Sequence, residues 1–304
     1  MENTKISWAH HTVNLWWGCY EVNKACDNCY AKQLANRYHG PDLLWEQKGP
    51  RMYVKSAMAD LKKYQERAEK EGVVYRIFIN SMSDLFERSM PVVDFKHNQM
   101  KISDAVPRNF GLSEFYYDVY LQTGHLRIFF FDVVKQCPNL FFILLTKRPS
   151  NIIKMVPSSW ITYPPANVIY MTSCPDQESV DTLLPQLLKV PGKRGLSIEP
   201  MIGPINLHAH ICKHGGINKP EQGYSDYICE PLDNLQWVIT GGESGHNARH
   251  LDYAWLCKIQ AQCESADIPY FLKQDSLANT KDYKNIDHFP SAMQVRQFPE
   301  YELV

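Results

Sequence analysis

The sequence predicts an α/β fold with a parallel sheet, because two patterns run along the chain. Seven short apolar runs recur, and helix-length segments separate most of them. Short, nearly continuous apolar runs are typical of strands that are buried on both faces, as in a parallel sheet with helices outside it. Strands that alternate with helices indicate repeated βα units, which form either a barrel or a doubly wound sheet.

Each element is expected from its own stretch of sequence. Helices are expected at residues 30–38, at residues 55–72, which stop at a glycine, and at residues 177–190 and 253–267, which carry apolar residues at helical spacing. The seven strands are expected at residues 12–16, 75–79, 140–145, 167–171, 194–198, 235–239 and 269–272.

Two stretches depart from this alternation. Residues 103–127 are aromatic and irregular, and residues 208–233 are rich in Gly, His and Pro. Loops longer than about 12–15 residues are commonly functional or mobile. We therefore expect a single domain over residues 1–304, with both stretches as excursions over one of its faces.

Composition narrows the class of protein. The 304 residues are 44% hydrophobic and 21% charged, which is ordinary for a globular protein and sufficient for a large core. The formal net charge is −1, so there is no overall basic excess of the kind that strong non-specific nucleic-acid binding shows. No apolar run reaches the roughly 18 residues that a membrane span needs, and the N-terminus has no apolar signal core. We expect a cytoplasmic protein with no membrane partner.

Three clustered cysteines form the most informative stretch. Cys19, Cys26 and Cys29 fall within eleven residues, directly after the first expected strand, and no fourth cysteine lies nearby. A structural zinc site takes four ligands, whereas a [4Fe–4S] cluster held by three cysteines keeps one iron open. Thiolates suit both metals, so zinc with a distant fourth ligand and cysteines without a metal stay open as alternatives. A disulfide is disfavoured because nothing indicates an oxidising compartment.

Polar residues follow nearly every other expected strand. In parallel α/β barrels the site is built at the carboxyl ends of the strands, so we expect these residues and the cysteine loop to share one site. They are Asn80, Ser81, Ser83 and Asp84, then Lys147 and Arg148, then Cys174, Glu199, the run Gly241, Gly242 and Glu243, and finally Lys273.

The residue types suggest roles. Cations such as Lys147, Lys273 and above all Arg148 suit a carboxylate or a phosphate. Glu199, Glu243 and Asp84 suit an ammonium group, ribose hydroxyls or proton transfer, and the two glycines allow close approach of a ligand to the backbone. A salt bridge between Lys147 and Glu199 is the structural alternative.

The cysteine loop and several strand ends together resemble the phage-type three-cysteine-motif family, which is itself similar to radical S-adenosylmethionine enzymes such as spore photoproduct lyase. The matching order extends over residues 6–274. Besides the loop, the segments that carry the resemblance are residues 80–86, 145–149, 197–200, 241–245 and 271–274.

The resemblance implies a partial TIM-type (β/α)6-7 barrel of the radical S-adenosylmethionine type. It implies that Cys19, Cys26 and Cys29 hold a [4Fe–4S] cluster and that the open iron binds S-adenosylmethionine. An electron from an external donor would then generate a 5′-deoxyadenosyl radical, which abstracts hydrogen from a substrate. The expected catalytic residues are Lys147, Glu199, Glu243 and Lys273. The expected cofactor-binding residues are Asn80, Ser81, Ser83, Asp84, Arg148, Gly241 and Gly242.

Three features depart from the pattern of those enzymes. Six residues separate Cys19 from Cys26, where three are common, and Asn28 stands where an aromatic residue often precedes the last cysteine. The glycine-glycine-glutamate run follows the sixth strand instead of the second. We therefore expect residues 80–84 to bind the methionine part of the cofactor and Glu243 to face substrate or ribose.

The substrate and the partners are less defined. Similarity to spore photoproduct lyase favours a nucleic acid or nucleotide, for repair or modification, with a protein partner as one means of delivery. The alternative from another class is a non-catalytic zinc- or cluster-binding barrel that acts as a partner in a phage or host-defence complex. A second metal site is a weaker expectation, at His208, His210, Cys212, His214 and Cys229. Aromatic residues of the first excursion either stack bases or pack on the barrel; they are Phe110, Phe115, Tyr116, Tyr117 and Tyr120.

Overall fold

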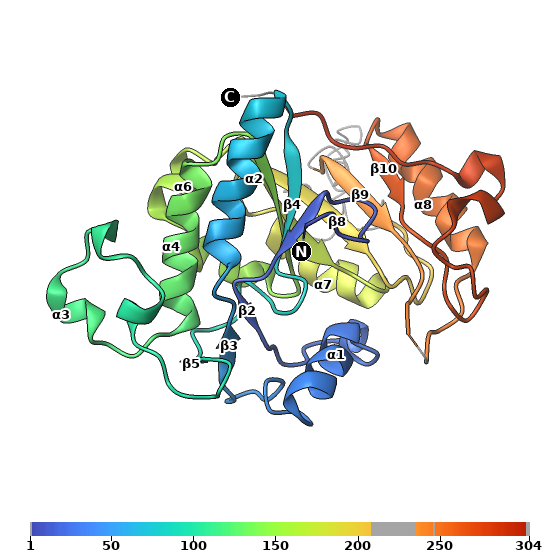
Figure 1. Ribbon diagram of the computed structural model, residues 1–304. Coiled ribbons are helices and arrows are strands. Elements are labelled where there is room, and N and C mark those ends of the chain that lie inside the picture. Colours follow the sequence, from blue (N-terminus) through green and yellow to red (C-terminus); the bar gives the residue numbers. More distant parts are fainter. Residues whose placement is uncertain (1, 208–234, 246, 302–304) are drawn as a thin grey trace, which may run out of the picture. The chain divides into compact units, whose positions relative to one another are not determined.

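The computed structural model describes residues 2–207, 235–245 and 247–301. In these residues a seven-stranded sheet has the order β1-β4-β6-β7-β8-β9-β10 (Figure 1). The registers of four neighbouring pairs are defined, and all four pairs are parallel. The strands are His11–Val13 (β1), Tyr75–Ile79 (β4), Leu140–Thr146 (β6), Val168–Ser173 (β7), Lys193–Ile198 (β8), Trp237–Thr240 (β9) and Tyr270–Leu272 (β10).

The strand order distinguishes between the two α/β architectures. Neighbours in this sheet follow one another along the chain without a reversal. A doubly wound sheet reverses its direction of growth at a switch point, whereas a barrel adds each new strand at the same edge. The order therefore confirms the predicted α/β fold of the partial TIM type.

The apolar runs located six of the seven strands to within two residues at either end, but the first expected strand is wrong as a single element. Residues 12–16 divide between β1 and the two-residue strand Trp16–Trp17 (β2), which belongs to a second sheet. The chain turns at Asn14, whose Oδ1 accepts from the Met82 N–H at 2.8 Å, while the Leu15 N–H donates to Asn80 Oδ1. The second sheet pairs β2 antiparallel with Arg51–Tyr53 (β3), and β3 parallel with Val92–Val93 (β5).

The chain divides into two compact units, and the boundary between them falls inside β7. The first comprises the described residues up to Ile169 together with Tyr301, and the second comprises Tyr170–Glu300. The helices of the first unit are Tyr30–His39 (α1), Ala57–Glu71 (α2), Glu114–Tyr117 (α3), Thr123–Lys135 (α4), Ile152–Met155 (α5) and Ser158–Thr162 (α6).

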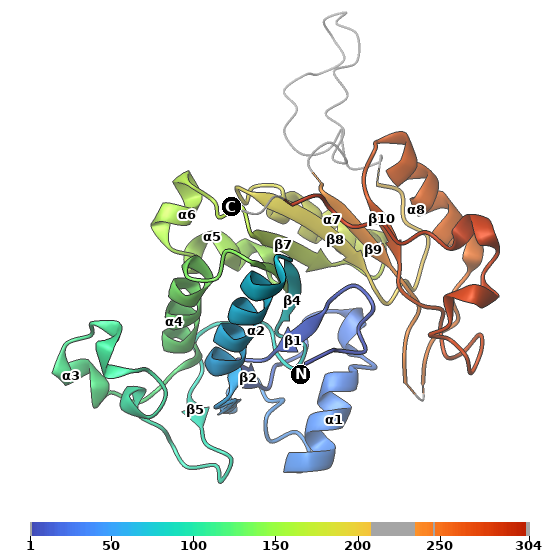
Figure 2. The ribbon, with the colours of Figure 1, turned by 45° about the horizontal axis from the view of Figure 1, so that its top comes forward.

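Helix α2 shows how the local sequence determines an element. Its buried residues recur at helical spacing, as Ala57, Leu61, Tyr64 and Ala68, and this spacing places them on one face. The helix ends where Gly72 adopts a left-handed conformation with φ 64° and its N–H bonds the last carbonyls. Figure 2 shows α2 and α4 side by side, in agreement with their direct contacts.

The second unit carries Gln177–Leu187 (α7) and Tyr253–Ser265 (α8), both of which begin as predicted. The side chain of the residue before each helix accepts a hydrogen bond from the first turn, Asp176 from the Ser179 N–H and Asp252 from the Ala254 N–H. These are N-caps, which satisfy amide groups that the helix itself leaves unbonded. Helix α8 lies against β10 (Figure 1).

The expected excursions have different outcomes. The irregular stretch from residue 103 ends at Gln122 rather than at Arg127, because α4 begins at Thr123 and buries Leu126 and Phe130. The stretch at residues 208–233, and with it the expected histidine and cysteine site, lies outside the described residues. Among the helices that are described, none combines the length and the apolar character that crossing a bilayer requires.

Candidate functional site

The carboxyl ends of β1, β4 and β6 lie at one level in the first unit. Val13 pairs with Ile79, and Ile79 pairs with Leu144. The residues that follow these positions therefore emerge at one edge of the sheet, which is where parallel α/β barrels build their sites. Residues 80–84 and 146–148 are brought together in this way, as the sequence predicts.

The cysteine loop is attached to the same edge. The Gly18 N–H donates to the Met82 carbonyl at 3.0 Å, and Gly18 forms a bridge with Ser83. Arg148 Nη2 donates to the Tyr20 carbonyl at 2.9 Å, and its guanidinium carbon lies 4.3 Å from the centre of the Tyr20 ring. The ends of β4 and β6 therefore both hold the start of the loop.

The buried Asp84 carboxylate accepts hydrogen bonds from several residues at this edge of the sheet. It accepts from Thr146 Oγ1 at 2.7 Å, from Arg148 Nη1 at 2.7 Å and from the N–H groups of Lys147 and Phe86. Burial acts to raise the pKa of Asp84, but the Arg148 charge and these hydrogen bonds outweigh it and lower the pKa. With all these donors, Asp84 serves to position Arg148, and the expectation that it contacts a cofactor stays a prediction.

All three cysteines of the loop are free thiols. Arg148 Nη1 lies 3.8 Å from Cys19 Sγ, and burial raises the pKa of the Cys19 thiol to about 12. Cys29 is the N-cap of α1, and its N–H donates to the Cys26 carbonyl at 3.2 Å. Cys19 and Cys29 also pack against one apolar cluster that includes Leu44 and Met82.

The donors of this loop fit an iron–sulfur cluster in type, since they are thiols beside a cation on one short segment. Within the described ranges, no three Cys, His, Asp or Glu side chains are arranged closely enough to hold a metal ion. The structure thus gathers the thiols on one anchored loop without arranging their sulfurs as a ligand set.

The other second-strand residues mostly serve local structure. Ser83 Oγ donates to the Trp16 carbonyl at 2.9 Å, and Ser81 Oγ exchanges hydrogen bonds with the Asn14 amide. Asn80 differs, because its Oδ1 accepts from the Leu15 N–H while its buried Nδ2 has no hydrogen-bond partner among the described residues. Buried donors without a partner are unusual in folded proteins, and the expectation that Asn80 binds a cofactor stays a prediction.

Beneath the loop lies an ion pair that sequence reasoning missed. Arg51 and Glu87 are fully buried and joined by two hydrogen bonds of 2.8 and 2.9 Å. Arg51 Nη1 donates to carbonyls of residues 44–50, and the Leu44 carbonyl accepts from the Cys19 N–H at 3.1 Å. No spacing in the sequence links these two residues, which are 36 positions apart, so no signal in the sequence could have identified the pair.

The remaining candidates belong to the second unit, where the ends of β8, β9 and β10 are also level. Ile198 pairs with Thr240, and Thr240 pairs with Leu272. Glu199 and Lys273 follow these strands and form an ion pair. Within the second unit, the partner of Glu199 is Lys273, and the structural alternative, a salt bridge between Lys147 and Glu199, stays a prediction.

Glu243 and the two glycines have firm structural partners in this unit. Arg249, which sequence reasoning did not single out, donates to both carboxylate oxygens of Glu243, at 2.7 and 3.0 Å. A Cβ on Gly242 would lie 2.2 Å from the Ser276 nitrogen. The close approach that Gly242 permits is thus to the backbone after β10, which accounts for this glycine without a ligand. Gly241 bonds through its N–H to the Ile198 carbonyl at 3.2 Å.

The aromatic residues of the first excursion divide into two groups. Tyr117 is buried and its hydroxyl donates to the Pro107 and Arg108 carbonyls, while Phe110 packs edge-on against Phe129. Phe115, Tyr116 and Tyr120 are exposed. Packing on the fold therefore explains part of this aromatic run, and base stacking by the exposed part stays a prediction.

Comparison with known proteins identifies a family for this chain but no activity. A family model described as "Protein of unknown function (DUF5131)" matches residues 3–110 and 116–292. No curated protein and no solved structure matches the chain significantly.

Proposed function

This chain belongs to the DUF5131 family, and from its own residues we propose that it is a radical S-adenosylmethionine-like iron–sulfur enzyme. The observation that carries the proposal is the anchored cysteine loop of the first unit. Three free thiols lie on one segment, and Arg148 ties that segment to the carboxyl end of the sheet. Active sites in TIM-type folds are built at that end.

Cys19, Cys26 and Cys29 would hold a [4Fe–4S] cluster. Three cysteine ligands leave one iron open, and with S-adenosylmethionine and an external electron donor such a cluster supplies a 5′-deoxyadenosyl radical. Burial disfavours the Cys19 thiolate, so this cysteine needs positive charge beside it to ionise. Arg148 supplies such charge from the protein side, and its orientation depends on Asp84.

The same unit would bind the methionine part of S-adenosylmethionine. Asn80 presents a buried Nδ2 donor at the end of β4, and an amide N–H suits a carboxylate. Ser81 and Ser83 support this run through the hydrogen bonds given above. Lys147, which follows β6, would add a cation for the same carboxylate or for a substrate phosphate.

The second unit would contribute groups for substrate. Glu199 and Lys273 form an ion pair at the ends of β8 and β10, and such a pair can hold or transfer a proton. Glu243, held by Arg249, would orient substrate or ribose hydroxyls. The proposed substrate class is a nucleic acid or nucleotide. A protein partner would deliver it, because the net charge of −1 gives the chain little general attraction to phosphate backbones.

Anaerobic reconstitution with iron and sulfide tests the proposal. The intact protein is expected to take up a cluster and, with S-adenosylmethionine and dithionite, to release 5′-deoxyadenosine. A variant with Cys26→Ala and Cys29→Ala is expected to do neither. The matched control carries Cys257→Ala and Cys263→Ala on α8, which removes two thiols outside the loop and is expected to retain both properties.

Two results would overturn the proposal. Equal iron uptake by the two double variants would show that the loop is not the cluster site. Zinc bound by the intact protein, without iron uptake, would favour the alternative, a non-catalytic barrel that acts as a partner in a larger complex.

A further inference from the structure

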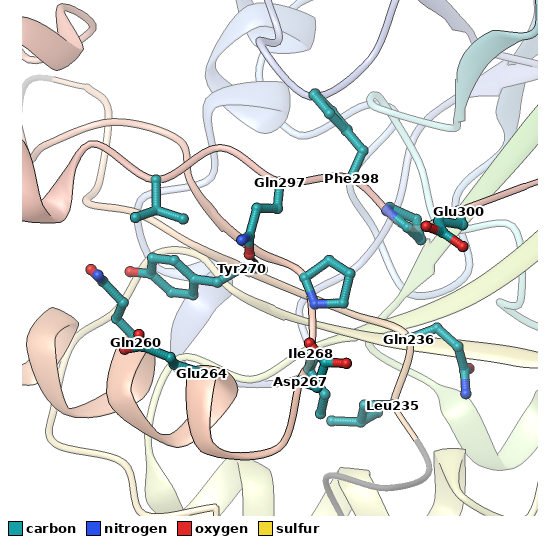
Figure 3. A pocket seen from close by; sticks show the side chains of 13 residues that line it. Leu235, Gln236, Gln260, Glu264, Asp267, Ile268, Tyr270, Gln297, Phe298 and Glu300 are labelled. Atoms are coloured by element: carbon teal, nitrogen blue, oxygen red, sulfur yellow. Dashed lines mark hydrogen bonds between the residues drawn. The ribbon is translucent and has the colours of Figure 1, made fainter.

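A pocket lies in the second unit at the amino ends of β9 and β10, the opposite ends of these strands from Glu243 and Lys273. It is built from the residues at the start of the two strands, from Gln260 and Glu264 of α8, and from residues 295 and 297–300 (Figure 3). Its volume is about 670 Å³, which is within the range of roughly 300–1,000 Å³ for small-molecule sites. It belongs neither to the cysteine loop nor to the candidate substrate residues.

Hydrogen bonds to the backbone hold the walls of this pocket. Gln236 Oε1 accepts from the Arg194 N–H at 2.6 Å, Gln260 Nε2 donates to the Ala292 carbonyl at 2.8 Å, and Gln297 Oε1 accepts from the Tyr270 N–H at 3.0 Å. Three lining side chains from three segments are thus fixed. A pocket with fixed walls loses little conformational freedom when a ligand binds.

The charge of the lining has one sign. Glu264, Asp267 and Glu300 come from α8, from the turn after it and from the C-terminal segment, and Figure 3 shows them at different places around the pocket. The described lining contains no Lys, Arg or His. No ion pair to these three carboxylates occurs in the part of the chain that the structure describes, so their charge is open to a ligand.

The remaining lining is apolar and aromatic. Tyr270 and Phe298 contribute rings, and the Phe298 ring is fixed by contacts with Trp237 and Phe271 at centroid distances of 5.8 and 5.1 Å. Leu235, Ile268, Pro269, Val295 and Pro299 complete the lining. Aromatic faces attract cations, and aliphatic chains bury favourably against apolar walls.

We propose that this pocket binds an aliphatic di- or polyamine, with its ammonium groups at the carboxylates and its methylene chain against the apolar wall. A monovalent metal ion would use the charge but not the apolar lining, and a neutral apolar compound would leave the carboxylates without partners. The proposal does not depend on the iron–sulfur chemistry.

Isothermal titration of the full-length protein with 1,6-diaminohexane tests this inference, and 1,6-hexanediol is the neutral probe of the same chain length. The diamine is expected to bind and the diol is not. Binding of the diamine is expected to weaken as sodium chloride is added, because salt screens exposed charges. Equal binding of the two compounds would overturn the inference, since it would show an apolar site without charge recognition.

A charge-matched pair of variants locates the site. The double variant Glu264→Gln/Glu300→Gln removes two of the three charges and keeps the shape of the lining. Asp267 is left unchanged, because its backbone has a positive φ of 53° that few residues adopt easily. Glu66→Gln with Glu69→Gln removes the same charge from the exposed part of α2. The first variant is expected to bind the diamine about fivefold more weakly, and the second as the parent does. Equal weakening in both variants, or none in either, would place the diamine elsewhere and overturn the proposal.

Discussion

The Asp84 carboxylate connects the ends of β4 and β6 at the scale of a single residue. It and Arg148 are each 8% exposed and form a 2.7 Å ion pair. Asp84→Asn is expected to lower the free energy of unfolding by about 3 kcal/mol at neutral pH, because it leaves a buried guanidinium without its counter-charge. Thr146→Val keeps the ion pair but removes two hydrogen bonds, the one that Thr146 Oγ1 donates to Asp84 and the one that it accepts from the Arg148 N–H. It is therefore expected to cost about 2 kcal/mol.

The same residue predicts a pH dependence. Since the pKa of Asp84 is lowered in the folded protein, its contribution to stability is complete above the unfolded pKa of about 3.9. That contribution is lost as the pH falls through the folded pKa. The stability difference between the parent and Asp84→Asn is therefore expected to shrink below about pH 4, as measured by urea unfolding at several pH values. A constant difference would show that Asp84 is not ionised in the fold.

Gly18 determines how closely the cysteine loop approaches its support. It has φ 115°, and a Cβ there would lie 2.6 Å from the Leu44 carbonyl oxygen and 2.7 Å from Arg51 Cδ. Gly18→Ala is therefore expected to cost about 3 kcal/mol. Gly40 has φ 91° with nothing within 4 Å of its Cβ position, so Gly40→Ala is expected to cost only the backbone strain, about 1–2 kcal/mol. Thermal unfolding compares them, and equal costs would argue against a steric role for Gly18.

At the scale of elements, α7 depends on the residue that precedes it, the N-cap Asp176. Asp176 accepts from the Ser179 N–H at 2.9 Å and from Ser179 Oγ at 2.6 Å. Asp176→Ala is expected to lower the free energy of unfolding by about 1 kcal/mol, and Asp176→Asn by less, because Asn also caps helices well. Denaturant unfolding of the two variants measures this, and equal losses would show that the charge matters more than the cap.

The elements also show what the sequence can predict. Strands β4, β6, β8 and β10 were located because continuous apolar runs of strand length have few other uses in an α/β chain. The break at Asn14 was missed, since the side-chain hydrogen bonds that cause it reach residues about 65 positions away. Helix α4 was not predicted, and its first residues were assigned to the irregular stretch, because its run of three phenylalanines obscures the helical period.

The candidate site was predictable in part for the same reason. Parallel strands place their carboxyl ends at one edge, so chain order alone brought residues 80–84 and 146–148 together. The partners of those residues depend on side-chain geometry that no spacing shows. Asp84 turns inward to Arg148, Glu243 is held by Arg249, and Gly242 makes room for backbone.

At the scale of the whole molecule, the chain leaves the first unit in β7 and returns to it at Tyr301. The Tyr301 ring stacks on Phe141 of β6 with centroids 4.5 Å apart, and its hydroxyl accepts from Arg76 Nη1 of β4 at 3.0 Å. A residue near the C-terminus therefore packs on two central strands of the first unit. Such a contact makes the stability of that unit depend on the end of the chain.

Tyr301→Ala is expected to lower the free energy of unfolding by about 2 kcal/mol, because it removes a half-buried ring and its stacking. Hydrogen exchange is expected to accelerate at the amides of β4 and β6 and to stay unchanged at those of β9 and β10, since exchange reports local opening. Tyr301→Phe keeps the stacking and is expected to cost at most about 1 kcal/mol. Equal acceleration in all four strands would mean instead that the two units open together, as one cooperative structure.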